Sequence, residues 1–178
     1  SLLDGTIDVT RVFSTGFAFA ALRADGSVVT WGDPNAGGNS SAVASLLDGT
    51  TDVTQVFSTG RAFAALRADG SVVTWGDPNF GGNSSTVATQ IDGSIDVSHV
   101  FSTTTGAFAA LNVEGSVVTW GYASAGGDSS SVASQLSNVA WLATPFTDDA
   151  YVAPAPPISG TPDNDHLIGT ASDDSIFG

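Results

Sequence analysis

The sequence predicts an all-β protein built from tandem antiparallel sheets that recur about every 44 residues. The segment Phe19–Gly32 returns unchanged as Phe63–Gly76, and it returns again as Phe108–Gly121 with Asn-Val-Glu in place of Arg-Ala-Asp. Each copy places an acidic residue and a glycine between two apolar, β-branched runs, which is the pattern of a β-hairpin. No apolar stripe of helical period has useful length. A fixed period of this kind indicates supersecondary units that stack on one another.

Within the first unit we expect three strands, at residues 7–14, 17–22 and 27–31. The Asp25-Gly26 pair predicts a type I′ turn between the second and third strands, with both residues at positive φ.

The first two strands are apolar on both faces, which is typical of sheets packed between neighbouring sheets. Small residues at Ala18, Ala20 and Ala21 would let such sheets approach closely. The sequence therefore predicts that each sheet buries both faces.

Residues 33–39 form a turn-rich loop rich in Gly, Pro, Asn and Asp. The short segment 40–44 fits either an outer strand or a helical turn. The third unit contains one extra residue, which we place in the loop Ser102–Gly106.

The repeats divide into units 1–44, 45–88 and 89–133, followed by a degenerate fragment, 134–144. Residues 139–144 fit either the first strand of a fourth unit or a strand that caps the third. The proline-rich stretch 145–159 is expected to be a linker. Residues 160–178 have a different period, with glycines nine residues apart.

Comparison of the three units separates a constant framework from changing loop positions. Position 17 is Phe17 in the first unit and Arg61 in the second, and Phe80 stands where the other units have alanine. The third loop changes outright and begins with Tyr122. We interpret Arg61, Phe80 and Tyr122 as candidate partner-binding residues, although neutral drift would give the same pattern.

The formal net charge is −14, from 18 acidic residues against four arginines and no lysine. This balance argues against nucleic acid as a partner, because phosphate contacts need clustered Lys or Arg. The absence of cysteine excludes disulfides, thiolate metal sites and a cysteine nucleophile. No run reaches the ~18 apolar residues of a membrane span. Because the chain opens inside a repeat and contains no methionine, we expect it to be a piece of a longer protein.

The hairpin core, with Asp-Gly-Ser-Val-Val-Thr-Trp-Gly before a glycine-rich loop, resembles the repeats of the regulator of chromosome condensation (RCC1) family. There each repeat is one blade of a β-propeller, and roughly seven blades close the ring. The compact units look most like those of secreted bacterial relatives. The resemblance implies a partial β-propeller of three repeats plus a fragment. Three units cannot close a ring, so either units are missing, or chains self-associate through open blade edges, or the array is an open solenoid.

The last 19 residues resemble the hemolysin-type (repeats-in-toxin, RTX) nonapeptide, which binds Ca²⁺ in a parallel β-roll. Asp165 and Asp174 take the ligand position of that motif, and Asp163 and Asp173 stand where glycine is usual and are added as candidate ligands. The resemblance implies a calcium-binding tract at the beginning of such a roll. It also implies type I secretion to an extracellular, calcium-rich medium.

Other candidates have a functional and a structural interpretation. Trp31, Trp75 and Trp120 could form a sugar-stacking platform, but core positions are favoured. Aspartate pairs such as Asp48 and Asp52 could hold cations, but turn formation is favoured. A catalytic or metal role for the two histidines, His99 and His166, is disfavoured, and no catalytic motif is recognised.

We therefore predict a non-catalytic binding or adhesion module from a large secreted bacterial repeat protein, with a calcium-binding C-terminal tract and a protein or glycan ligand. A structural spacer without a partner of its own is the alternative. A carbohydrate-active enzyme on a propeller is the least favoured hypothesis.

Overall fold

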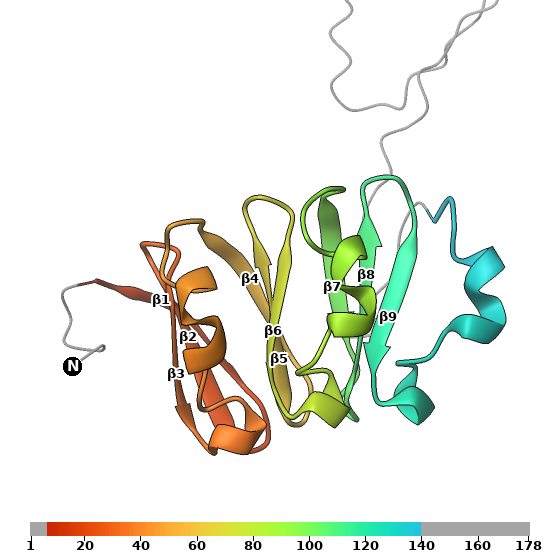
Figure 1. The fold of residues 1–178 in the computed structure, drawn as a ribbon. Coiled ribbons are helices and arrows are strands. Elements are labelled where there is room, and N and C mark those ends of the chain that lie inside the picture. Colours follow the sequence, from red (N-terminus) through yellow and green to blue (C-terminus); the bar gives the residue numbers. More distant parts are fainter. Residues whose placement is uncertain (1–6, 140–178) are drawn as a thin grey trace, which may run out of the picture. The chain divides into compact units, whose positions relative to one another are not determined.

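The computed structural model describes residues 7–139, which form three antiparallel three-stranded sheets in tandem (Figure 1). Each sheet keeps its strands in chain order. The strands are β1 (Val9–Ser14), β2 (Ala18–Arg23), β3 (Val28–Gly32), β4 (Val53–Ser58), β5 (Ala62–Arg67), β6 (Val72–Gly76), β7 (Val97–Ser102), β8 (Ala107–Asn112) and β9 (Val117–Gly121). The predicted all-β class and the three strands per unit are confirmed, in an unclosed arrangement consistent with a partial β-propeller.

The turn between β2 and β3 differs from the predicted type I′ turn. Only Gly26 has a positive φ, +73°, and Asp25 does not. The Gly26 amide donates to the Arg23 carbonyl (3.1 Å), and the Arg23 amide donates to the Ser27 carbonyl (2.9 Å). This is a three-residue loop that ends in a left-handed glycine, which is another common hairpin connection. The Asp25 carboxylate accepts hydrogen bonds from the Ser27 hydroxyl and amide, and so holds the loop in this form.

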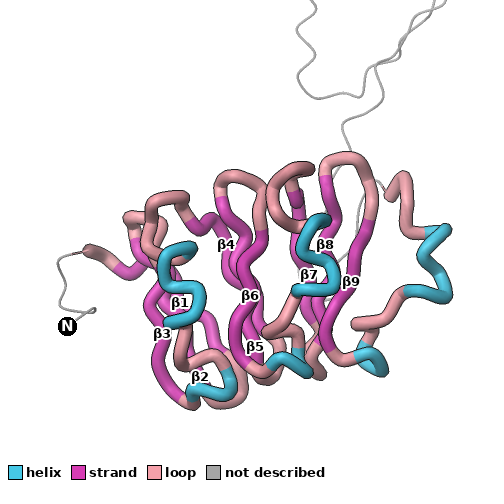
Figure 2. Tube along the Cα trace, viewed as in Figure 1, coloured by secondary structure: helices cyan, strands magenta, loops and turns pink. Residues whose placement is uncertain are grey.

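Two short 3₁₀ helices follow each sheet along the chain (Figure 2). They are η1 (Pro34–Ala36), η2 (Ser41–Leu46), η3 (Pro78–Phe80), η4 (Ser85–Gln90), η5 (Ala123–Ala125) and η6 (Ser130–Gln135). Segment 40–44 therefore takes the helical alternative. The helices η2 and η4 lie against the third strand of the following unit, β6 and β9 respectively, so they bridge the seams between sheets.

Both faces of the middle sheet are buried, as predicted. The prediction is wrong for the first sheet, because Val12 and Phe19 on one of its faces are exposed and no described unit precedes them. Alternation along β5 directs Phe63 and Ala65 toward the first unit, whereas Ala62, Ala64 and Leu66 face the third unit. Each seam thus packs the small face of one sheet against the large aromatic face of the next.

A glycine receives the aromatic ring at each seam. At Gly37, a Cβ would lie 2.5 Å from the Phe63 ring, so only glycine leaves room for it. The Trp75 indole stacks on Phe63 and donates its Nε1 hydrogen to the Gly37 carbonyl (3.0 Å).

The second seam repeats this arrangement with Phe108, Trp120 and Gly81, where the indole bond is 3.1 Å. The core interpretation therefore holds for Trp75 and Trp120, whereas Trp31 is 38% exposed.

The loop between β7 and β8 is one residue longer than its counterpart between β1 and β2, as predicted for the extra residue. At the end of the described chain, the Val139 amide donates to the Gly115 carbonyl (2.8 Å). In the first seam, the Val53 amide donates to the Gly26 carbonyl in the equivalent hydrogen bond (2.9 Å). Val139 thus occupies the position at which the first strand of the next unit begins. The predicted linker 145–159 and the tract 160–178 lie outside the described residues.

Candidate partner-binding surface

The structure brings the three predicted partner-binding residues together in one stack, which Phe17 extends. The Arg61 guanidinium carbon lies 5.1 Å from the Phe17 ring centre and 5.6 Å from the Phe80 ring centre. Phe80 stacks on Tyr122 with ring centres 5.9 Å apart. We call Phe17, Arg61, Phe80 and Tyr122 the aromatic ladder.

The aromatic ladder draws on all three units because equivalent loops gather at one end of the sheets. Phe17 and Arg61 each directly precede the second strand of their unit, β2 and β5. Phe80 ends η3, and Tyr122 directly follows β9. These segments lie at the lower end of the array in Figure 1. The stacking of units thus converts changes at separate sequence positions into one continuous surface.

A glycine in the third unit makes room for Phe80. Gly106 is equivalent to Phe17 and Arg61, because its carbonyl accepts the Tyr122 amide (2.9 Å) as the Arg61 carbonyl accepts the Asp77 amide (3.0 Å). A Cβ at Gly106 would lie 2.5 Å from the Phe80 ring. The large side chain at position 80 therefore requires the glycine at 106, and in the sequence the only signal of this pairing is that both residues differ from their repeat equivalents.

The ladder presents both aromatic and cationic chemistry to solvent. Phe17 is 57% exposed and Tyr122 is 49% exposed. Arg61 lies 3.9 Å from the Asp77 carboxylate, with 42% of its side chain exposed. Cation–π contacts of exposed groups stabilise by about 0.5–1 kcal/mol each, enough to orient the guanidinium. Tyr and Arg are, with Trp, the residue types enriched among those that contribute most to protein–protein binding.

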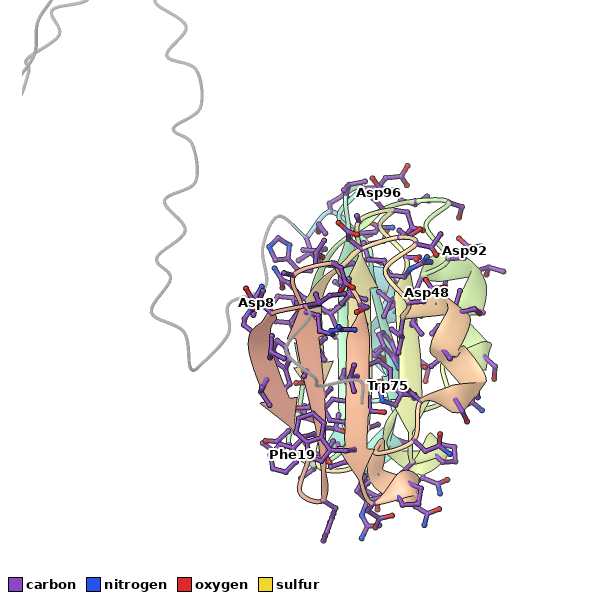
Figure 3. The ribbon with its side chains drawn as sticks, turned by 90° about the vertical axis from the view of Figure 1, so that its left-hand side faces the viewer. Asp8, Phe19, Asp48, Trp75, Asp92 and Asp96 are labelled. Carbon is purple, nitrogen blue, oxygen red and sulfur yellow. The ribbon has the colours of Figure 1, made fainter. Side chains whose placement is uncertain are left out.

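The described members of the recurring aspartate pairs lie at the opposite end of the sheets, where Figure 3 labels Asp8, Asp48, Asp92 and Asp96. Asp48 accepts the Thr50 amide (2.8 Å), and this bond holds the pKa of Asp48 below its ordinary value. Asp92 accepts the Ser94 amide in the same way. These contacts support the turn interpretation. Among residues 7–139, no three side chains of His, Cys, Asp or Glu form a group that could hold a metal ion.

The remaining candidates are placed as follows. His99 stacks on Phe101 (6.2 Å) and approaches the Ser98 hydroxyl on β7. His166 and the four predicted calcium ligands Asp163, Asp165, Asp173 and Asp174 lie outside the described residues. No helix within the described part of the chain is both long and apolar enough to cross a membrane.

No family model and no curated protein matches the sequence. Among solved structures, the chain is similar to human WBSCR16 (23% identity, TM-score 0.43), covering 66% of this chain and 35% of that one. It is also similar to yeast RCC1 (Prp20) solved with Kap60 (19% identity, TM-score 0.47, 66% and 32% covered). A third is the CRINKLY WD40 ectodomain of the Arabidopsis thaliana receptor kinase ACR4 (17% identity, TM-score 0.45, 66% and 41% covered). The chain thus spans well under half the length of these structures, and its fold is assigned from its own three sheets.

Proposed function

We propose that this chain is a non-catalytic binding module that recognises a protein ligand through the aromatic ladder. The observation that carries the proposal is the convergence of Arg61, Phe80 and Tyr122, residues that differ from their repeat equivalents, on one exposed stack. The strands are largely constant between repeats and the loop tips change, as expected of a rigid scaffold that presents a binding surface on its loops.

The chemistry of the ladder suits a protein ligand. Two exposed aromatic rings supply apolar area at little cost in side-chain entropy, and the oriented guanidinium supplies a charged hydrogen-bond donor. Asp8, Asp48, Asp92 and Asp96 lie at the far end of the sheets, so a ligand at the ladder avoids these four carboxylates, although Asp77 lies beside Arg61.

The test uses random peptides displayed on phage and selected on the native chain. Selected clones should bind the Arg61→Ala and Tyr122→Ala variants about tenfold or more weakly. Val113→Ala serves as the matched control, because Val113 is exposed but lies in the hairpin loop at the other end. Clones that bind all variants equally would contradict the assignment of the ladder, and binding only to a glycan array would contradict a protein ligand.

The tail adds a second part to the proposal. Residues 160–178 bind Ca²⁺ through Asp165 and Asp174, with Asp163 and Asp173 as additional candidate ligands. The nine-residue spacing of the glycines and aspartates supports this assignment. A secreted, extracellular bacterial protein fits such a tract, because exported RTX chains meet millimolar calcium outside the cell.

Self-association through open sheets remains a further proposal about partners. The exposed large face of the first sheet, which includes Phe19 and Trp31, supports it. If the repeats are instead a structural spacer without a ligand, substitutions in the aromatic ladder should not change the binding of any peptide.

A further inference from the structure

We infer that the two ends of the described array are halves of one interface, so that the third unit of one copy docks on the first unit of a second copy. The first half is the large face of the first sheet, formed by Val12, Phe19 and Trp31, which we call the first-unit face. Figure 3 looks onto this face, with Phe19 in front.

The repeat equivalents of the first-unit face are buried inside the protein. Phe19 is 45% exposed, whereas Phe63 and Phe108 are 0% and 1% exposed. Val12 is likewise exposed, and its equivalents Val56 and Val100 are buried. The same side chains therefore bury against a preceding unit wherever the described chain provides one.

The second half lies on the last unit, at Gly126 and Val132, which we call the third-unit face. Gly37 and Gly81 each hold an aromatic ring of the next unit, but no described atom lies within 4 Å of a Cβ built at Gly126. Gly126 nevertheless keeps the left-handed backbone, with a φ of +98°, compared with +97° at Gly37 and +95° at Gly81. The receptor for a ring is thus formed, although no described ring fills it.

Two further details match this receptor to the first-unit face. Val132 is 40% exposed, whereas its equivalent Val87 is buried in the second seam. The Trp75 and Trp120 indoles bond the carbonyls of Gly37 and Gly81, which leaves Trp31 and Gly126 as the corresponding donor and acceptor at the two ends.

Backbone pairing between units gives the contact a direction. The Gly16 amide donates to the Gly60 carbonyl, and the Gly60 amide donates to the Thr104 carbonyl, each at 3.0 Å. Both described seams also join the small face of one unit to the large face of the next, and neither joins two like faces. The interface between copies is therefore heterologous, and each added copy again presents one face of each kind.

The occupant is a second copy of this chain because the described protein already makes this interface twice within itself. The residues after Val139 are the competing occupant of the third-unit face, and their occupancy would keep the chain monomeric.

The test is sedimentation of the full chain in chelator, from micromolar to near-millimolar concentration. The native chain should associate progressively, and Phe19→Asp and Val132→Asp should each remain monomeric at concentrations about tenfold higher or more. Val113→Asp is the control for a charge placed on an exposed apolar residue, and it should associate as the native chain does. Circular dichroism confirms that each variant folds, and Val12→Asp replaces Phe19→Asp if that variant does not.

Mixing the two monomeric variants tests the direction of the contact. Phe19→Asp retains an intact third-unit face and Val132→Asp an intact first-unit face, so the mixture should form dimers that grow no further. A native chain that stays monomeric throughout overturns the inference. If the Val132→Asp variant still associates by itself and only the Phe19→Asp variant does not, two first-unit faces contact each other. That result would also overturn the inference.

Discussion

A single carboxylate holds each of the first two hairpin loops in this protein. The Asp69 carboxylate accepts the Ser71 hydroxyl (2.6 Å) and the Ser71 amide (3.1 Å), and Arg67 lies 3.2 Å from its other oxygen. The bond from the Ser71 hydroxyl is the largest cause of the lowered pKa of Asp69. Asp25 and Ser27 repeat the arrangement in the first unit.

We expect Ser71→Ala to raise the pKa of Asp69 toward its ordinary value of 3.8 while that of Asp25 stays unchanged. Because the folded-state pKa is the lower one, the bond stabilises the fold above the ordinary pKa, and its contribution is lost as pH falls through the lowered value. NMR titration of the side-chain carboxyl carbons measures both groups in one sample. Equal pKa values in the native and variant chains would mean that the hydroxyl does not hold Asp69.

Two glycines with a left-handed backbone allow the cost of backbone strain to be separated from the cost of a clash with an aromatic ring. Gly81 and Gly126 have nearly the same φ, yet only Gly81 faces an aromatic ring, that of Phe108. In dilute solution we expect Gly126→Ala to lower the free energy of unfolding by about 1–2 kcal/mol from backbone strain. Gly81→Ala should lose a further ~1–3 kcal/mol, because the Phe108 ring must move. Chemical denaturation measures both, and equal losses would show that the Phe108 ring accommodates the added methyl group at no cost.

At the scale of elements, the strands could be predicted from the sequence, but the turn could not. Apolar residues on both faces of β2 and β5 indicated burial between sheets, because a sheet with one solvated face would alternate. The Asp25-Gly26 pair suits both a two-residue turn and a three-residue loop that ends in glycine. The Ser27 amide and hydroxyl donate to Asp25 and help to hold the second form, and the Asp-Gly pair alone does not include this contribution from Ser27.

The candidate site could be predicted only in part. Arg61, Phe80 and Tyr122 stood out because each differs from its repeat equivalents. Their contact with one another depends on the offset between stacked sheets, which places position 61 between Phe17 and Phe80. A repeat period fixes which residues are equivalent, but the offset comes from packing of aromatic rings over glycines.

At the scale of the whole molecule, the binding role proposed for the ladder and the calcium binding proposed for residues 160–178 can be tested separately. Replacing Asp165 and Asp174 with Ala should abolish any calcium-induced change in amide NMR signals of residues 160–178, because carboxylates supply the oxygens that Ca²⁺ requires. Signals of β5 are the internal control and should not move in either chain. Equal calcium shifts in native and variant chains would refute the tail assignment.

Within the described residues, the units stack through equivalent seams, and the large face of the first sheet is exposed. Fluorine NMR of the chain labelled with fluorotryptophan tests this claim most directly, in dilute solution with chelator and a soluble paramagnetic agent. Substitution of each tryptophan by Phe in turn assigns the signals. We predict strong broadening of Trp31 and protection of Trp75 and Trp120, whose indoles lie in the two seams. Equal protection or equal broadening of all three would contradict the open array of stacked sheets.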